Sequence, residues 1–265
     1  MCGIVGVLNL NDLPPVDPLV LRGMLAMIRH RGPDGFGIYR DPHIGMGNAR
    51  LSIIDLSGGD QPIGNEDGTL WIVYNGEVFN YVELRPQLEA SGHRFSTQTD
   101  TEVILHLYEE YGPECLRFLN GQFALAIWDQ KNRSLFLARD RAGIRPLFYS
   151  YHAGQLLFAS EVKSLLSVPG MRAEVERGAL REVFTNWSVQ PPRTIFTGIS
   201  ELPPAHYLYY QEGQIEIVPY WGLDYSEDQP QRGEGEYLDE LESLLIDATR
   251  IRLRADVSVG AYLSG

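Results

Sequence analysis

The chain begins with the stretch Met1-Cys2-Gly3-Ile4-Val5-Gly6-Val7, in which an apolar strand follows directly on a cysteine. If Met1 is removed, Cys2 carries a thiol and a free α-amino group on one residue. An α-amino group has an ordinary pKa of about 7.7 to 8.0, against about 8.5 for the thiol, so it can take the thiol proton near neutral pH. Alternatively, Cys2 is a small, partly buried apolar residue at a strand start. The dipeptide alone favours this second interpretation, and the rest of the chain must decide.

Composition bounds the class of protein. The chain has 265 residues, 29.8 kDa of mass and 44% hydrophobic residues, enough for one large domain and a smaller piece. Its formal net charge of -13 argues against nucleic acid and anionic membranes as partners. Two cysteines, Cys2 and Cys115, build neither a disulfide framework nor a cysteine metal site, so we predict no metal and a reducing, cytoplasmic setting. We also expect a soluble protein, because no apolar run approaches membrane-spanning length.

Two charged side chains are candidates for binding a small substrate. Arg50 lies inside an apolar strand predicted over 44–54, where an arginine is usually paired or at an edge. Its planar guanidinium also suits a carboxylate held by two parallel hydrogen bonds. Asp100 would ordinarily cap the helix predicted over 97–112, but Thr99 and Glu102 have the spacing of a capping box. If Thr99 is the cap, the Asp100 carboxylate is free to bind a cation such as an ammonium group.

A third candidate follows the apolar strand predicted over 70–74, which runs into Asn75-Gly76-Glu77. Asn-Gly is a hairpin signal. The next stretch, 81–91, has helical spacing instead, which favours a strand-to-helix turn. Asn75 and the backbone N–H of Gly76 in such a turn could supply two donors to one oxyanion.

The remaining pattern indicates an α+β sandwich with helices outside two sheets. Further helices are predicted near 17–30 and 177–187, strands over 123–128, 135–138, 146–151 and 156–159, and a late hairpin that pairs 206–210 with 214–218.

Composition changes near residue 224. Residues 224–233 are polar and read as a linker, and an amphipathic helix follows with Leu238, Leu241 and Leu245 on one side. A β run is predicted over 257–263. One helix and one strand cannot bury a core, so we expect this end to be the start of a further domain.

The sequence resembles the class II glutamine amidotransferases, and within them the glutamine-hydrolysing asparagine synthetases. The matching stretches, in the family's order, are Met1-Cys2-Gly3-Ile4, Arg31-Gly32-Pro33-Asp34-Gly35, Arg50-Leu51-Ser52-Ile53-Ile54-Asp55, Asn75-Gly76-Glu77, Thr99-Asp100-Thr101-Glu102, Arg139-Asp140-Arg141, Phe158-Ala159-Ser160-Glu161 and Leu202-Pro203-Pro204. Each motif is weak by itself, but the ordered set is specific and covers essentially the whole chain.

The resemblance implies an N-terminal-nucleophile hydrolase fold, a four-layer αββα sandwich. It implies a glutaminase domain over 1–222, a linker over 223–233 and, over 234–265, the truncated start of an α/β pyrophosphate-loop synthetase domain. Leu263, Ser264 and Gly265 would open the ATP-binding loop of that domain.

The resemblance also implies a glutamine site. Met1 would be removed and Cys2 would attack the side-chain amide of L-glutamine, with Asn75 and the Gly76 N–H as the oxyanion hole. The substrate-binding residues would be Arg50 for the α-carboxylate, Asp100 and Glu77 for the α-ammonium, and the backbone of Leu51, Ser52, Ile53 and Ile54 along the pocket. Glutamine hydrolysis would need no cofactor.

In the family the ammonia passes to a C-terminal synthetase domain that activates aspartate with ATP and Mg²⁺. We therefore expect L-glutamine and that domain as partners, and a homodimer is one assembly that the sequence allows. By itself the chain would be a glutaminase at most.

Three positions depart from the family pattern: Asp60 for the usual histidine or small residue, Phe79 for tyrosine and Ala205 for glycine. The alternatives left open are an amidotransferase for another acceptor, such as the amidophosphoribosyl or hexosamine-forming enzymes, an acylase for a different amide, and a non-catalytic module of the same fold.

Overall fold

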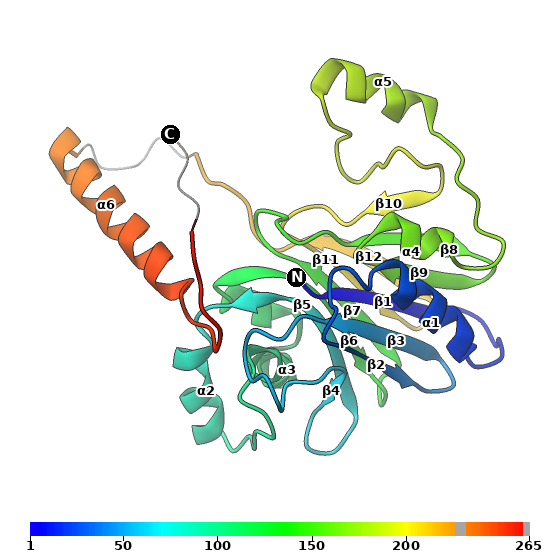
Figure 1. Cartoon of the computed structure of the whole chain (residues 1–265), viewed down its shortest axis with the longest axis horizontal. Helices are drawn as coiled ribbons and strands as arrows, with labels where there is room; N and C mark the ends of the chain where they lie inside the picture. Colours follow the sequence, from blue (N-terminus) through cyan, green and yellow to red (C-terminus); the bar gives the residue numbers. More distant parts are fainter. Residues whose placement is uncertain (226–231, 262–265) are drawn as a thin grey trace.

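Two six-stranded antiparallel sheets form the centre of the protein (Figure 1). The computed structural model describes residues 1–225 and 232–261. The first sheet has the order β10-β8-β9-β1-β3-β2, with β10 Ile199–Glu201, β8 Phe148–His152, β9 Gln155–Ala159, β1 Gly3–Asn9, β3 Ile44–Arg50 and β2 Gly35–Arg40. The second has the order β12-β11-β7-β6-β5-β4, with β12 Gln214–Pro219, β11 His206–Gln211, β7 Ser134–Arg139, β6 Gly121–Asp129, β5 Leu70–Val78 and β4 Ile63–Gly64.

Three apolar cores separate four layers. The central core lies between the sheets, where Ile4 and Met46 of the first face Val73 and Trp128 of the second. A second core joins the first sheet to helices α1 (Pro18–Met27) and α4 (Val162–Leu166). The third joins the second sheet to α2 (Tyr81–Ala90), α3 (Asp100–Tyr111) and the 3₁₀ helix η1 (Gly112–Arg117). The predicted α+β class and αββα sandwich are confirmed.

The N-terminus of α3 follows the predicted capping only in part. The Thr99 hydroxyl accepts the backbone N–H of Glu102 at 3.2 Å, as expected for the cap. The second bond of a capping box, from the Thr99 backbone N–H to the Glu102 carboxylate, is replaced. The Glu102 carboxylate instead accepts the backbone N–H groups of Ser96 and Thr97, both at 2.7 Å. Thr99 therefore caps the helix and leaves Asp100 available for another role.

Asn75 and Gly76 do not form the predicted strand-to-helix turn. Both lie inside β5, where Asn75 pairs with Ala124 and Gly76 with Phe123 of β6. The turn follows at Phe79 and Asn80, after β5 ends at Val78, and α2 begins at Tyr81 as expected. Pairing along the whole length of β6 extends the strand through the hairpin-like Asn-Gly pair, so the hairpin alternative is wrong.

The C-terminal part differs more. The predicted helix is confirmed as α6 (Glu234–Ile251), which stands apart from the sandwich, as does α5 (Arg177–Asn186) (Figure 1). The strand predicted over 257–263 is wrong for residues 257–261, which are irregular. No described strand lies alongside to pair with them, and a strand needs such a partner. Leu263, Ser264 and Gly265, the predicted ATP-loop residues, lie outside the described residues. Within the described part of the chain, no helix is both long and apolar enough to cross a membrane.

Candidate active site

A cleft opens beside the N-terminus, where the start of β1 meets the end of β5 and the start of α3. It brings together residues from five separate parts of the sequence. They are Met1, Cys2, Arg50, Leu51, Ile53, Ile54, Gly59, Gln61, Tyr74, Asn75, Gly76, Glu77, Thr99, Asp100, Thr101 and Arg145. Most of the residues predicted from the sequence therefore share one cavity.

Cys2 is fixed at the start of β1 by contacts on both its side chain and its backbone. Its sulfur accepts the backbone N–H of Leu51 at 3.3 Å, and its thiol lies 3.5 Å from the Leu51 carbonyl oxygen. Arg31 Nε donates to the Cys2 carbonyl oxygen at 2.9 Å, and Arg31 Nη1 pairs with Glu161 at 3.1 Å. Arg31 and Glu161, each in one of the quoted motifs, thus position the cysteine.

The loop that carries Arg31 passes very close to β3. A Cβ atom at Gly32 would lie 2.2 Å from the backbone of Ala49, so only glycine fits there. This close approach places the Arg31 guanidinium against the backbone of Cys2.

Burial shifts the pKa of two groups at the N-terminus. Burial raises the pKa of the Cys2 thiol above its ordinary value, and burial lowers the pKa of the N-terminal ammonium, which here belongs to Met1. A lower ammonium pKa leaves more free amine near neutral pH.

The side-chain amide of Asn75 has an unsatisfied hydrogen-bond donor. Its side-chain Nδ2 is buried and has no hydrogen-bond partner among the described residues. An unsatisfied buried donor costs about 1 to 3 kcal/mol, so such groups are uncommon without a function.

The backbone N–H of Gly76 faces the same edge of the sheet. On either side of it in β5, the N–H of Tyr74 donates to Gln61 Oε1 at 2.6 Å and that of Val78 donates to Asp100 Oδ2 at 2.9 Å. Amide directions alternate along a strand, so the Gly76 N–H has the same direction as these two. Asn75 and Gly76 therefore offer two donors to the cleft from within a strand.

Arg50 is buried at the end of β3, on another wall of the cleft. Its guanidinium donates to the carbonyl oxygens of Ile54 at 3.3 Å and Asp55 at 2.6 Å. Nη1 donates to Asp60 at 2.7 Å, and the Asp60 side chain is 85% exposed. An exposed carboxylate is thus the only charged partner of Arg50 among the described residues, at the position where the sequence departs from the family pattern.

Asp100 is buried at the first turn of α3 and points toward β5. Its Oδ2 accepts the Tyr74 hydroxyl and the Val78 N–H, both at 2.9 Å. Burial, aided by the nearby Glu77 carboxylate, raises the pKa of Asp100 to about 6 against the hydrogen bonds from Val78 and Tyr74 that lower it. At neutral pH the Asp100 carboxylate is charged, but burial makes this charge unfavourable. A bound cation would stabilise the charge, so the position suits a site for a cation.

The segment after β3 lines the cleft with Leu51, Ile53 and Ile54. Ser52, predicted to line it too, does not belong to the lining, because its backbone N–H turns outward to Asp34 Oδ2 at 2.8 Å. The far side of this segment is held by Asp256, whose N–H donates to the Ile53 carbonyl oxygen at 2.9 Å and whose carboxylate accepts the Asp55 N–H at 2.7 Å.

Sequence reasoning missed several residues of the cleft, notably Gln61, Tyr74 and Arg145. Their contacts depend on pairing between distant elements. The Asp140 carboxylate, for example, accepts the N–H groups of Phe123 and Arg145 at 3.1 and 3.0 Å, which folds the loop that brings Arg145 to Met1. A local signal existed only in the Arg139-Asp140-Arg141 motif.

The other two departures lie outside the cleft. Phe79 packs under the guanidinium of Arg252, 4.8 Å from its ring centre. Ala205 adopts a left-handed conformation with φ of 58°, which explains why glycine suits this position.

Comparison with known proteins agrees with this geometry. The family model described as "Glutamine amidotransferase domain" matches residues 1–221. The asparagine synthetase [glutamine-hydrolyzing] 1 of Bacillus subtilis (strain 168) is 38% identical over all of this chain, which covers 42% of that protein. Asparagine synthetase B [glutamine-hydrolyzing] of Escherichia coli (strain K12) is 34% identical over all of this chain, covering 43% of it. The amidase chry2 of Gibberella zeae is 39% identical over 92% of this chain and 37% of its own length.

Solved structures share the fold. The glutamine phosphoribosylpyrophosphate amidotransferase of B. subtilis superposes with a TM-score of 0.60 and 21% identity, over 83% of this chain and 49% of that one. The chain spans less than half the length of the curated relatives named above. The family model nevertheless matches residues 1–221, which is most of the chain, so the chain belongs to the family of glutamine amidotransferase domains.

Proposed function

We propose that this chain is a glutaminase: Cys2, exposed by removal of Met1, hydrolyses the side-chain amide of L-glutamine to glutamate and ammonia. The observation that carries the proposal is the buried and unpartnered Nδ2 of Asn75 in the cleft that also holds Cys2. A tetrahedral intermediate would supply the negative oxygen that this donor lacks.

The reaction proceeds through a thioester. The α-amine of Cys2 takes the thiol proton, and the sulfur attacks the amide carbon of glutamine. The oxyanion that forms accepts hydrogen bonds from Asn75 Nδ2 and the Gly76 N–H. When the carbon–nitrogen bond breaks, the ammonium of Cys2 returns its proton to the leaving ammonia. Water then attacks the thioester, releasing glutamate and restoring the thiol.

Two charges would select a free amino acid. Arg50 has the geometry to hold the α-carboxylate, for which it would exchange its bond to the exposed Asp60. Asp100, with Glu77 beside it in the cleft, would hold the α-ammonium. None of these steps needs a cofactor.

In a longer protein, the ammonia would pass to a synthetase domain that uses ATP and Mg²⁺ to activate aspartate. The names of the B. subtilis and E. coli relatives, and the share of their length that this chain covers, support this assignment. Residues 1–222 would then be the glutaminase domain, 223–233 a linker and 234–265 the start of the synthetase domain. A homodimer stays a prediction.

A different acceptor is the second candidate, because an amidase is as similar in sequence as the synthetases are. Glutamine hydrolysis is common to both candidates. Amide formation on aspartate by the longer protein, measured with ATP and glutamine, separates them.

Glutamate release from L-glutamine by the purified chain tests the proposal, with Cys2→Ala beside it and an intact mass to confirm loss of Met1. We expect activity in the parent and none in Cys2→Ala. Glutaminamide and N-acetylglutamine, which lack the α-carboxylate and the α-ammonium respectively, should be hydrolysed at least tenfold less efficiently. Equal activity in Cys2→Ala would contradict the assignment, and a folded parent without Met1 that releases no glutamate would favour the non-catalytic module.

A further inference from the structure

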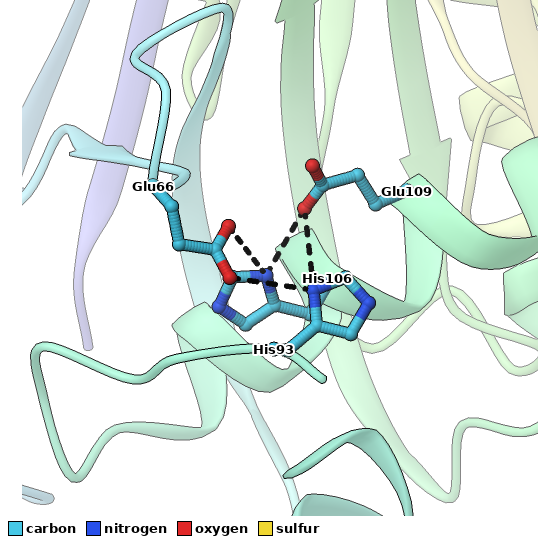
Figure 2. Close-up of side chains that lie close together, drawn as sticks. All are labelled: Glu66, His93, His106 and Glu109. Carbon is cyan, nitrogen blue, oxygen red and sulfur yellow. Dashed lines mark hydrogen bonds and ion pairs between the residues drawn. The ribbon is translucent and has the colours of Figure 1, made fainter. Parts of the chain in front are cut away.

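A cluster of two histidines and two glutamates lies beside helix α3 (Figure 2), and none of the four residues lines the cleft. Glu66 comes from the turn between β4 and β5, His93 from the connection between α2 and α3, and His106 and Glu109 from one face of α3. One ligand atom from each residue lies within 4.8 Å of all the others. The two imidazole rings lie side by side, with centres 4.5 Å apart.

Both histidines turn Nδ1 toward both carboxylates. Nδ1 of His106 lies 3.1 Å from Glu109 Oε2 and 3.6 Å from Glu66 Oε2. Nδ1 of His93 lies 3.5 Å from Glu66 Oε1 and 3.7 Å from Glu109 Oε2. Three of these four distances exceed the range of a hydrogen bond between such groups. All four lie within ion-pair distance, so two imidazole nitrogens and the carboxylate oxygens converge on one small space.

The spacing fits ligands around one metal ion. Four ligands placed tetrahedrally at about 2.0 to 2.1 Å from Zn²⁺ stand about 3.3 Å from one another, by the geometry of a tetrahedron. The four nitrogen–oxygen distances, 3.1 to 3.7 Å, lie near that value, with His106 facing Oε2 and His93 facing Oε1 of Glu66, and one ligand atom from each residue lies within 4.8 Å of the others. Two carboxylates would also neutralise the charge of a divalent ion.

The outer ring nitrogens support the same conclusion. His93 Nε2 lies 2.9 Å from Glu110 Oε1, and because an ionised carboxylate only accepts, the histidine donates from Nε2. Its Nδ1 is then the ring nitrogen that faces the two carboxylates of the cluster. His106 Nε2 faces Glu102 Oε1 at 3.8 Å. Glu110 therefore supports the ring of His93 as carboxylates support metal-bound imidazoles, whereas the buried Nε2 of His106 has no hydrogen-bond partner among the described residues.

The glutamates are oriented as well. Glu109 Oε1 accepts the side-chain amide of Asn65 at 2.8 Å, which directs Oε2 toward the two histidines. Glu66 Oε1 accepts the backbone N–H of Arg94 at 2.8 Å. His106 is fully buried, whereas the side chains of Glu66 and Glu109 are 34% and 28% exposed. An ion can therefore reach the cluster from the glutamate side.

We propose that Glu66, His93, His106 and Glu109 bind one divalent transition-metal ion, preferentially Zn²⁺. Two imidazoles and two carboxylates in tetrahedral spacing suit zinc better than Mg²⁺ or Ca²⁺, which prefer six or more oxygen ligands. With four protein ligands the site is structural. It ties the β4–β5 turn and the α2–α3 connection to helix α3, whose first residue, Asp100, reaches the cleft.

The sequence analysis predicted no metal, because it considered only cysteines. His93, His106 and Glu109 occur within 17 residues, and His106 and Glu109 are three apart on a helix. This spacing is weak evidence for a metal site by itself, and only the structure places Glu66 beside these residues.

Calorimetric titration of the chelator-treated protein with zinc chloride tests the proposal. A Cys2→Ala background removes the accessible thiol, a competing zinc ligand. We expect one ion per chain, and no comparable binding of Mg²⁺. His93→Gln and Glu66→Gln, chosen because neither side chain is fully buried as that of His106 is, should each weaken binding at least tenfold. His43→Gln, a change of the same kind at a half-buried histidine between β2 and β3, should leave it unchanged.

Thermal unfolding gives a second readout that is independent of activity. Zinc in large excess over its dissociation constant should raise the Tm of the parent by roughly 5 °C, and that of His93→Gln by much less. Absence of saturable binding in the parent, or equal binding in the parent and both cluster variants, would overturn the proposal and leave the cluster as an ion-pair network.

Discussion

The backbone N–H of Leu51 donates a hydrogen bond of 3.3 Å to the sulfur of Cys2, across 49 residues of sequence. This contact joins the start of β1 to the segment that follows β3, and it fixes the sulfur at the opening of the cleft. The Leu51 N–H can stabilise a thiolate at Cys2, but only after a base has removed the thiol proton. The proposed base is the α-amine of Cys2 itself.

The position of a purification tag should therefore decide activity. A tag that leaves residues in front of Cys2 converts its α-amine into an amide, which cannot accept a proton. We expect at least a hundredfold loss of glutaminase activity with an N-terminal tag and full activity with the same tag at the C-terminus. Matching Tm values for the two proteins would show that folding is unaffected. An active N-terminally tagged protein whose mass shows the tag intact would rule out the amine as the base.

Asn75→Ala should lower kcat for glutamine by about 10² to 10³, with little change in KM, because an oxyanion-hole donor acts mainly in the transition state. Stability should hardly change, since Nδ2 has no partner to lose among the described residues. Asn132→Ala, in the β6–β7 turn, is the matched control and should keep parent kinetics. A large rise in KM at constant kcat would instead assign Asn75 to ground-state binding.

Asp100 should make glutamine use depend on pH. Its pKa of about 6 means that the carboxylate becomes protonated below pH 6 and loses its attraction for the α-ammonium. We expect kcat/KM to fall as pH is lowered from 7 to 5. Asp100→Asn should raise KM at least tenfold at pH 8, measured by initial rates.

The raised pKa of Asp100 makes stability and activity change in opposite directions with pH: activity rises with pH, whereas the contribution of Asp100 to stability falls. The folded protein binds the Asp100 proton more tightly than the unfolded chain, whose carboxyl titrates near its ordinary pKa of 3.8. The contribution of Asp100 to stability therefore decreases as pH rises from about 4 to 6. Asp100→Asn should have a Tm at pH 8 equal to or above that of the parent, so a much lower Tm would show that the carboxylate is needed for folding.

Asp60→Asn should lower KM for glutamine about two- to fivefold, as expected when a weak, exposed ion pair no longer competes for Arg50. The substrate carboxylate would meet less repulsion at the guanidinium. Steady-state kinetics at low salt give the largest effect, since salt screens exposed charges. The control is Asp12→Asn at an exposed position, which should change neither constant, and an increase in KM would show that Asp60 organises Arg50 for the substrate.

Removal of residues 223–265 should leave a folded domain with a weakened cleft. The three cores of the sandwich are built almost wholly from earlier residues. The truncation removes both backbone contacts of Asp256 with Ile53 and Asp55, and the ion pair of Arg254 with Glu83. We expect a cooperative thermal transition and a KM raised several-fold. An insoluble product would place the domain boundary after residue 222.

Local pattern was sufficient for most elements. Helices α1, α2, α3, α5 and α6 follow apolar spacing of 3.6 residues, and the late hairpin β11–β12 follows its turn residues. Pattern failed where pairing decided the outcome: β5 runs through Asn75-Gly76 because β6 lies alongside, and residues 257–261 are irregular because no described strand does.

The sequence by itself determined which chemical groups are available: a cysteine behind the initiator, an arginine in an apolar strand, a spare carboxylate after a threonine cap and the ordered motifs of one family. Only the tertiary structure decided which of them meet. It excluded Ser52 from the cleft, added Gln61, Tyr74 and Arg145, paired Arg50 with Asp60, and gathered Glu66, His93, His106 and Glu109 at one point. The physical reason is that the range of propensity and capping is a few residues, whereas these contacts depend on how two sheets and their helices pack across the whole chain.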